Sequence, residues 1–100
     1  MPTLDKDAIW ILRGAQRKTV FINLPKEMFM PNKLRKELNA RLQTLGLQVP
    51  LSLTEMSRHV KGFERRGLIE CSNEEDPYNK IYSLTSKGRK LQSNLSSLKL

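Results

Sequence analysis

The sequence predicts one small domain that is mainly α-helical and carries a single β-hairpin near its end. The chain has 100 residues, which is enough for one hydrophobic core and not for two. Apolar residues recur at helical spacing over most of the first two thirds of the chain. Two strand-like segments, Leu68–Ser72 and Ile81–Thr85, are joined by a polar stretch that contains Pro77 and Asn79. We therefore expect residues 1–100 to form a single unit.

The N-terminal part, residues 1–24, is expected to hold two helices. Thr3 can cap a first helix over Leu4–Arg13. The centre of this helix, Ala8–Leu12, is apolar on all sides, so it needs cover on more than one face. A second helical stretch over Gly14–Leu24 ends there, because the proline that follows cannot continue a helix.

A third helix is expected to begin at Pro31, since proline suits the first turn of a helix. The segment before it, Met28–Met30, is too short for a helix and fits a very short strand. The apolar residues of the third helix recur at helical spacing, and they are Leu34, Leu38, Leu42 and Leu45. Gly46 follows in the position where glycine usually ends a helix.

A fourth helix follows the connector Leu47–Leu51. Ser52 can cap it, with Glu55 three residues later, as in a capping box. Its inward stripe is Met56, Val60 and Phe63, and Gly67 ends it. In the hairpin that comes next, Ile69 and Cys71 can face inward opposite Tyr82 and Leu84. Thr85 can cap a last helix with the apolar stripe Leu91, Leu95 and Leu98.

The charge balance narrows the classes of partner. The chain has 18 Lys and Arg against 10 Asp and Glu, a formal net charge of +8 that favours polyanions. Nucleic acid is therefore the leading partner, although ribosome-associated and membrane-surface proteins share this composition. No apolar run is long enough to span a bilayer, and the N-terminus lacks the order of a signal peptide. Because the single cysteine cannot form an internal disulfide, we expect a cytoplasmic protein.

Two parts of the sequence resemble a known family. They are Ser57–Lys61 with Phe63–Glu70 (SRHVK and FERRGLIE), and Ile81–Thr85 with Lys87–Gly88 (IYSLT and KG). Over nearly the whole chain the sequence resembles winged-helix regulators of the MarR and ArsR kinds, especially archaeal ones. The resemblance implies a winged helix-turn-helix fold that binds double-stranded DNA. Its implied units are N-terminal helices over 1–24, a helix-turn-helix over 31–66, a wing over 67–85 and a C-terminal helix over 86–100.

Two features depart from that family. The connector Gly46–Leu51 is longer than the tight turn of the family's helix-turn-helix. The tip of the wing carries Glu74, Glu75 and Asp76 against one base, Lys80, so we expect phosphates to repel part of the wing.

The fourth helix carries the main candidate DNA contacts, on the face away from its apolar stripe. They are short hydroxyls, long cations and one acid: Ser52, Thr54, Glu55, Ser57, Arg58, Lys61 and Arg65. A solvated helix face has the same composition. The resemblance implies, however, that the N-terminal half of this helix enters the major groove, with Arg58 as the foremost base contact. Lys61 and Arg65 are expected to meet phosphates.

Further contacts are expected outside the fourth helix. The bases of the third helix can serve solubility alone, but the start of that helix near Asn32 also suits a phosphate. We therefore add Asn32, Lys33, Lys36 and Lys80 to the candidate DNA contacts.

No catalytic, metal or cofactor site is expected. One His and one Cys cannot supply the three or four ligands that zinc needs. We expect His59 to pack or hydrogen-bond, and Cys71 to pack as a small apolar residue, with a redox-sensor role as the alternative. The chain has no glycine-rich phosphate loop and no supported Ser, His and acid constellation, so we do not expect an enzyme.

The terminal helices are expected to form a homodimer. The helix around Trp10 and the stripe of Leu91, Leu95 and Leu98 together exceed what one small core needs, and the resembled family usually dimerises through such helices. We expect a nucleoid-associated, sequence-specific transcriptional regulator that reads a pseudo-palindromic site. The alternatives are a low-specificity chromatin-type protein that coats DNA and a winged-helix module that docks another protein. No pocket signature indicates a small-molecule effector.

Overall fold

The computed structural model describes residues 6–47 and 49–97. In this part of the chain the elements are α1 (Lys6–Leu12), α2 (Ala15–Ile22), α3 (Pro31–Ala40), α4 (Leu42–Leu45), α5 (Leu53–Arg65), β1 (Ile69–Cys71), β2 (Tyr82–Leu84) and α6 (Ser86–Ser97). The prediction of a mainly helical protein with one small hairpin is confirmed. The expected cap Thr3 and helix start Leu4 lie outside the described residues, as does Leu98. None of the described helices is long and apolar enough to cross a membrane.

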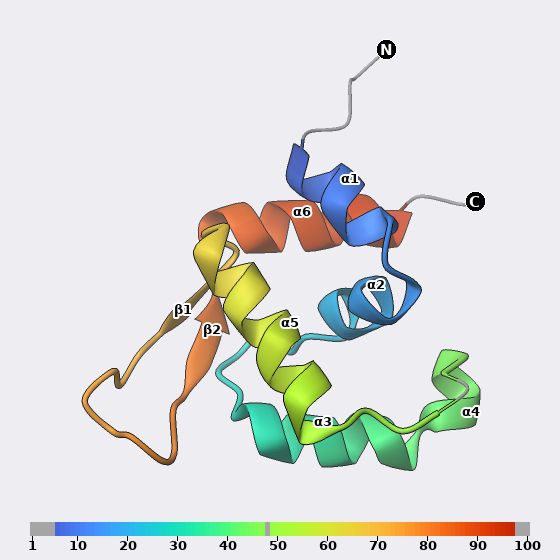
Figure 1. The fold of residues 1–100 in the computed structure, drawn as a ribbon. Coiled ribbons are helices and arrows are strands. Elements are labelled where there is room, and N and C mark those ends of the chain that lie inside the picture. Colours follow the sequence, from blue (N-terminus) through green and yellow to red (C-terminus); the bar gives the residue numbers. More distant parts are fainter. Residues whose placement is uncertain (1–5, 48, 98–100) are drawn as a thin grey trace.

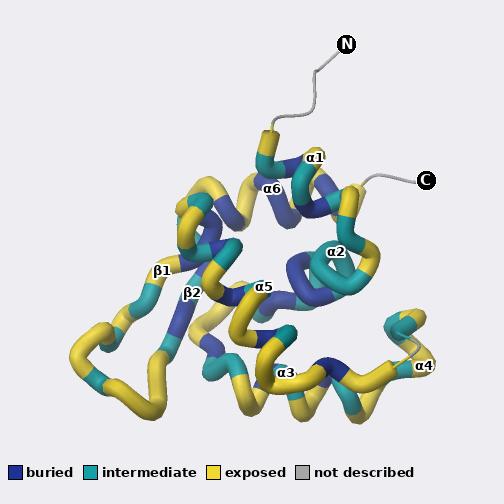
Figure 2. Tube along the Cα trace, viewed as in Figure 1, coloured by how far each residue is buried: buried dark blue, intermediate teal, exposed yellow. Residues whose placement is uncertain are grey.

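Helix α5 runs from one end of the molecule to the other. In Figure 1, α3 lies along the lower end and α6 along the upper end, and the loop between β1 and β2 projects away from the helices. Buried positions turn toward the centre, whereas the hairpin loop and the start of α5 are exposed (Figure 2). This arrangement leaves α3, α5 and the hairpin loop free to form one surface.

One hydrophobic core holds the helices together. At its centre the rings of Phe21 and Phe63 are fully buried, and their centroids are 5.2 Å apart. Leu91 and Leu95 of α6 are also buried in this core. The premise that the leucine stripe of the last helix exceeds the needs of one core is therefore wrong for these two residues.

The third helix is shorter than predicted. Arg41 leaves the helical conformation (φ −115°, ψ 23°), and this residue separates α3 from α4. The break turns the chain so that Leu45 and Leu47 pack against the edge of the core. Gly46 ends α4 with φ 76°, as predicted, and the backbone N–H of Leu47 donates to the carbonyl of Leu42 over 3.0 Å.

A buried glutamine joins α2 to α6. Helix α2 ends at Ile22, two residues earlier than predicted. The side-chain nitrogen of Gln92 donates to the carbonyl oxygens of Phe21 at 3.0 Å and Leu24 at 2.7 Å. The Leu24 carbonyl lies just past the end of α2, and Gln92 gives it a hydrogen-bond partner, while the Phe21 carbonyl also accepts from the Leu24 N–H at 3.2 Å.

The connector before α5 is fixed to α3. The side chain of Asn39 accepts a hydrogen bond from the Leu51 N–H at 2.8 Å and donates one to the Leu51 carbonyl at 3.1 Å. Arg35 donates to the same carbonyl at 3.2 Å, and the Leu51 side chain is buried in the core. The extra length of the connector thus does not loosen the placement of α5 beside α3.

The hairpin has the predicted register. Ile69 pairs with Leu84, and Cys71 pairs with Tyr82, although each strand has only three residues. Tyr82 also pairs with Phe29, because each backbone N–H donates to the other residue's carbonyl, at 2.8 and 2.9 Å. The very short strand predicted around Phe29 is therefore present as a single bridge.

The hairpin and α6 approach each other closely at a glycine. The Thr85 hydroxyl accepts from the Gly88 N–H at 3.0 Å, as the predicted helix cap, and donates to the Gly67 carbonyl at 2.6 Å. A Cβ on Gly88 would lie 1.9 Å from the Leu68 carbonyl oxygen, so this contact requires glycine. Gly67 itself has φ 74°, which favours glycine at the end of α5.

Candidate nucleic-acid interface

A groove of about 510 Å³ runs between α3, α5 and the hairpin loop. We call it the basic groove. The polar and cationic residues that line it are Asn32, Lys33 and Lys36 from α3, Ser57 and Lys61 from α5, and Asn79 and Lys80 from the loop. Within the part of the chain that the structure describes, no Asp or Glu lines the basic groove. Three elements far apart in the sequence thus contribute cations to one surface.

The exposed face of α5 continues the basic groove. A shallower depression beside it is lined by Leu53, Thr54, Ser57, Arg58 and Lys61. The basic groove and this depression share three lining residues, which are Leu53, Ser57 and Lys61. The structure therefore brings most of the predicted DNA contacts together, from Asn32 on α3 to Lys80 on the hairpin loop.

The cations of this surface are not held by the protein itself. Arg58, Lys61, Lys33, Lys36 and Lys80 are all exposed. Within residues 6–47 and 49–97, none of them has an ion pair or a side-chain hydrogen bond. A cation without an internal partner can neutralise a phosphate without first breaking a contact.

Two predicted contacts serve the fold of α5 instead of the groove. The Ser52 hydroxyl accepts from the Glu55 N–H at 3.0 Å, and the Glu55 carboxylate accepts from the Ser52 N–H at 3.0 Å. This is the predicted capping box. Glu55 also accepts from the Gln16 side chain at 3.2 Å, and the hydrogen bonds from Ser52 and Gln16 lower the pKa of Glu55. Both carboxylate oxygens of Glu55 are thus engaged within the chain.

Arg65 lies apart from the other predicted contacts. It is exposed in the last turn of α5, and it lines neither the basic groove nor the depression beside it. Asn32 lines the basic groove, but its side-chain oxygen accepts two hydrogen bonds from Arg35, at 2.9 and 3.1 Å. Its amide nitrogen remains the group that can donate to a ligand.

His59 supports α5 from the side of α2. Its Nε2 lies 2.7 Å from Oε1 of Gln16, and its ring stacks on Phe63 with centroids 6.3 Å apart. Burial lowers the pKa of His59, and the nearby Arg17 lowers it further. The predicted packing and hydrogen-bonding role is confirmed. Gln16, which joins Glu55 to His59, has no local signal in the sequence.

The hairpin loop has a fixed backbone. One oxygen of Asp76 accepts from the N–H groups of Tyr78 at 2.8 Å and Asn79 at 2.9 Å, and these two bonds lower its pKa. The Asn73 side chain donates to the Asn79 carbonyl at 2.8 Å and accepts from the Ile81 N–H at 2.6 Å. The loop thus holds Tyr78, whose surface is 89% exposed, in a defined position beside the basic groove.

The acidic residues of the loop lie away from the basic groove. Glu74, Glu75 and Asp76 line a separate depression with Cys71, Ser72 and Asn73. Lys80 and Tyr78 lie on the other arm and line the basic groove. The expected repulsion of part of the wing by phosphates would therefore concern the acidic arm and not the arm that lines the basic groove.

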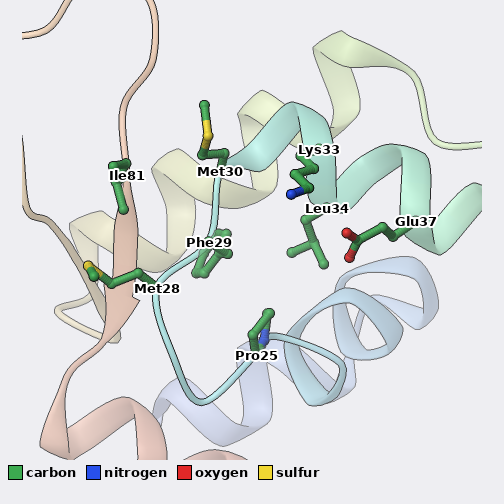
Figure 3. A pocket seen from close by; sticks show the side chains of 8 residues that line it. All are labelled: Pro25, Met28, Phe29, Met30, Lys33, Leu34, Glu37 and Ile81. Carbon is green, nitrogen blue, oxygen red and sulfur yellow. The ribbon is translucent and has the colours of Figure 1, made fainter.

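A second groove lies beside the start of α3. It has a volume of about 300 Å³ and is lined by Pro25, Met28, Phe29, Met30, Lys33, Leu34, Glu37 and Ile81 (Figure 3). The wall formed by α3 carries Lys33 and Glu37, whereas Met28 and Ile81 come from the other side (Figure 3). Met28 is 64% exposed. We call this second groove the apolar groove, and no pattern in the sequence predicted it.

Other cations are bound into the fold at the far end of α5. Asp7 forms ion pairs with Arg66 at 2.9 Å and Lys87 at 2.7 Å. Burial alone would raise the pKa of Asp7, but the hydrogen bonds from Lys87 and Arg66 outweigh burial and lower it. Two guanidinium groups lie over the Trp10 ring, that of Arg17 at 4.4 Å and that of Arg66 at 4.2 Å from its centroid. We call these five residues the Trp10 cluster.

Comparison with known proteins adds no assignment. No protein-family model matches the sequence, and no curated protein or solved structure matches it either. Among the described residues, no three His, Cys, Asp or Glu gather as a metal site would require. The basic groove and the exposed face of α5 are therefore the features that indicate a function.

Proposed function

We propose that this protein is a winged helix-turn-helix protein that binds double-stranded DNA, with α5 as its recognition helix and the β1–β2 hairpin as its wing. One observation carries the proposal. Five exposed cations from α3, α5 and the hairpin loop converge on one surface, and no acidic residue among those that the structure describes lines the basic groove. Phosphate neutralisation supplies most of the affinity of such surfaces for DNA.

The exposed face of α5 suits the major groove. That groove is about 12 Å wide and admits an α-helix. Thr54, Ser57 and Arg58 offer short hydroxyls and a bidentate cation to base edges, while the lysines on either side suit phosphates. We therefore propose sequence-specific binding, as in a transcriptional regulator that acts on chromosomal DNA in the nucleoid.

Salt dependence and sequence competition test the proposal together. Duplexes selected from random DNA would give a preferred site, and fluorescence anisotropy would give Kd at several salt concentrations. We expect log Kd to change with log salt by about 0.9 for each phosphate contact. We also expect a scrambled duplex to bind at least about 1,000-fold more weakly. Equal affinity for the scrambled duplex would indicate a DNA-coating protein instead.

The apolar groove favours a second candidate, a module that docks another protein. Its exposed Met28 and its apolar lining suit a protein side chain better than a phosphate. If the chain bound every duplex weakly and without a steep salt dependence, this candidate would replace DNA binding.

We also propose a homodimer, because two recognition helices related by two-fold symmetry would read a palindromic site. The dimer contact would not be made by the predicted leucine stripe of the last helix. The exposed residues of α6 between Ser86 and Ser97 are all polar or charged, whereas Ile9 of α1 is 39% exposed. Ile9→Glu should weaken the dimer in sedimentation velocity while the circular dichroism spectrum stays native. A monomeric wild-type protein at tens of micromolar would contradict the dimer.

A further inference from the structure

Leu53 is an exposed apolar side chain on a surface that combines cations with apolar residues such as Met30 and Pro77. It is the first residue of α5, and 60% of it is exposed. It lines both the basic groove and the depression beside it. Its neighbours in these depressions include Ser57, Arg58 and Lys61. Leu53 is therefore the apolar group at the point where the two parts of the proposed DNA surface meet.

The hydrophobic core does not use this side chain. Leu53 precedes Met56 by three positions, so it extends the inward stripe of α5, but the stripe leaves the core at this first turn. Leu51, two residues earlier, already fills the core there and is held by Asn39. No residue in the described part of the chain buries Leu53, so its burial requires a further group.

We infer that Leu53 contacts the 5-methyl group of a thymine in the major groove, and this inference rests on the proposed function. The base edges in the major groove present hydrogen-bond donors and acceptors, and the thymine methyl is their apolar group. Thr54 and Arg58, which line the same depression, would hydrogen-bond to the adjacent base edges. Contact between the two apolar groups removes both from water, so Leu53 would favour thymine over cytosine at one position.

Deoxyuridine tests this contact, because it differs from thymidine only in lacking the 5-methyl group. Each thymine of the preferred duplex would be replaced in turn, and Kd would be measured by fluorescence anisotropy. For the wild-type protein, one replacement should weaken binding about threefold to tenfold. Leu53→Ala should weaken binding to the unmodified duplex by a similar factor and should no longer respond to that replacement.

Val49→Ala is the matched control. Val49 is 61% exposed, is apolar like Leu53 and lies in the connector outside both depressions. This variant should bind like the wild type and keep the response to deoxyuridine. The inference is overturned if no single replacement changes the wild-type Kd, or if Leu53→Ala keeps the full response. Failure to prefer any duplex would instead overturn the proposed function, and the inference with it.

Discussion

The two ends of α5 use cations in different ways. At the C-terminal end, Arg66 pairs with Asp7 and stacks on Trp10, and Lys87 reaches the same carboxylate. In the N-terminal half and just beyond it, Arg58 and Lys61 are exposed and have no partner among the described side chains. The first set stabilises the packing of α1 on α5, and the second is available to a ligand.

This difference shows why net charge locates no binding site. The formal charge of +8 counts the cations of the Trp10 cluster and those of the basic groove alike. Arg66 must give up an ion pair before it can meet a phosphate, whereas Lys61 gives up only water. Whether a cation can bind DNA thus depends on its partners within the protein more than on how many cations the surface carries.

The largest expected effect is the loss of stability that follows a substitution in the Trp10 cluster. Trp10→Ala should lower the free energy of unfolding by about 2 to 4 kcal/mol, because the ring packs edge-on against Phe63 and contacts two guanidinium groups. Urea denaturation measures this loss. Under conditions where the variant stays folded, its Kd for the preferred duplex should equal that of the wild type. A parallel loss of affinity would contradict the assignment of the two ends of α5 to different roles.

Arg58→Ala should have the next largest effect, on binding and not on stability. It should cost about 1 to 3 kcal/mol on the preferred duplex and much less on random DNA. Arg89→Ala is the control, since it removes the same charge from α6, where Arg89 donates to the Lys26 carbonyl at 3.3 Å. If Arg58→Ala and Arg89→Ala changed the specificity ratio equally, α5 would not be the recognition helix.

Two lysines, Lys61 and Lys87, are expected to differ in the same way. Lys61→Ala should lower the salt slope of DNA binding by about 0.9 per subunit, because it removes one phosphate contact. Lys87→Ala should leave that slope unchanged and lower the free energy of unfolding by at most about 1 kcal/mol, since Lys87 belongs to the Asp7 ion pairs. Titration of Kd against salt and urea denaturation separate the two outcomes.

The smallest expected effect concerns the pH dependence of stability. Burial lowers the pKa of His59 below its ordinary value, while Glu55 nearby favours the charged form and Arg17 and Arg58 oppose it. As the pH falls, His59 is therefore protonated in the unfolded chain before it is protonated in the folded chain. The contribution of neutral His59 to the free energy of unfolding is complete above about pH 6.5 and is lost below it. We expect Tm to fall by about 1 to 3 °C between pH 7.5 and pH 5.5.

His59→Gln should remove this dependence. The variant keeps a side chain that can bond to Gln16 but has no group that titrates in this range. The pKa of Asp7 is also lowered, but protonation of Asp7 affects stability only below about pH 3.8, outside the range from pH 7.5 to 5.5. A wild-type Tm that is constant from pH 7.5 to 5.5 would contradict the prediction.

Local signals predicted the starts of α5 and α6. Ser52 and Glu55 are three residues apart, and Thr85 caps the N–H of a residue three positions later. Such partners are recognisable because both stand in the same short stretch of sequence. The break at Arg41 escaped prediction, since the leucine spacing continues through it into α4, and Leu45 packs against the core beyond it.

Contacts between distant residues could not be predicted in this way. His59 and Gln16 are 43 positions apart, and the bond from Gln92 to Leu24 spans 68. The fate of an apolar residue likewise depends on what covers it. Leu95 is spaced like a free stripe but is buried, whereas Leu53 is spaced like a core residue but is exposed. The exposed face of α5 was predictable, and the groove that the hairpin loop forms with it was not.

Trp10 is the only tryptophan of the chain, which makes it a natural spectroscopic probe. Its ring packs against Gly62 and Phe63, and neither these residues nor Trp10 line the basic groove. When α1 separates from α5, the indole exchanges two guanidinium groups and a phenyl ring for water, so its emission maximum should move to longer wavelength. Intrinsic fluorescence would therefore follow unfolding without a label, while DNA titrated into the folded protein would leave the emission wavelength in place.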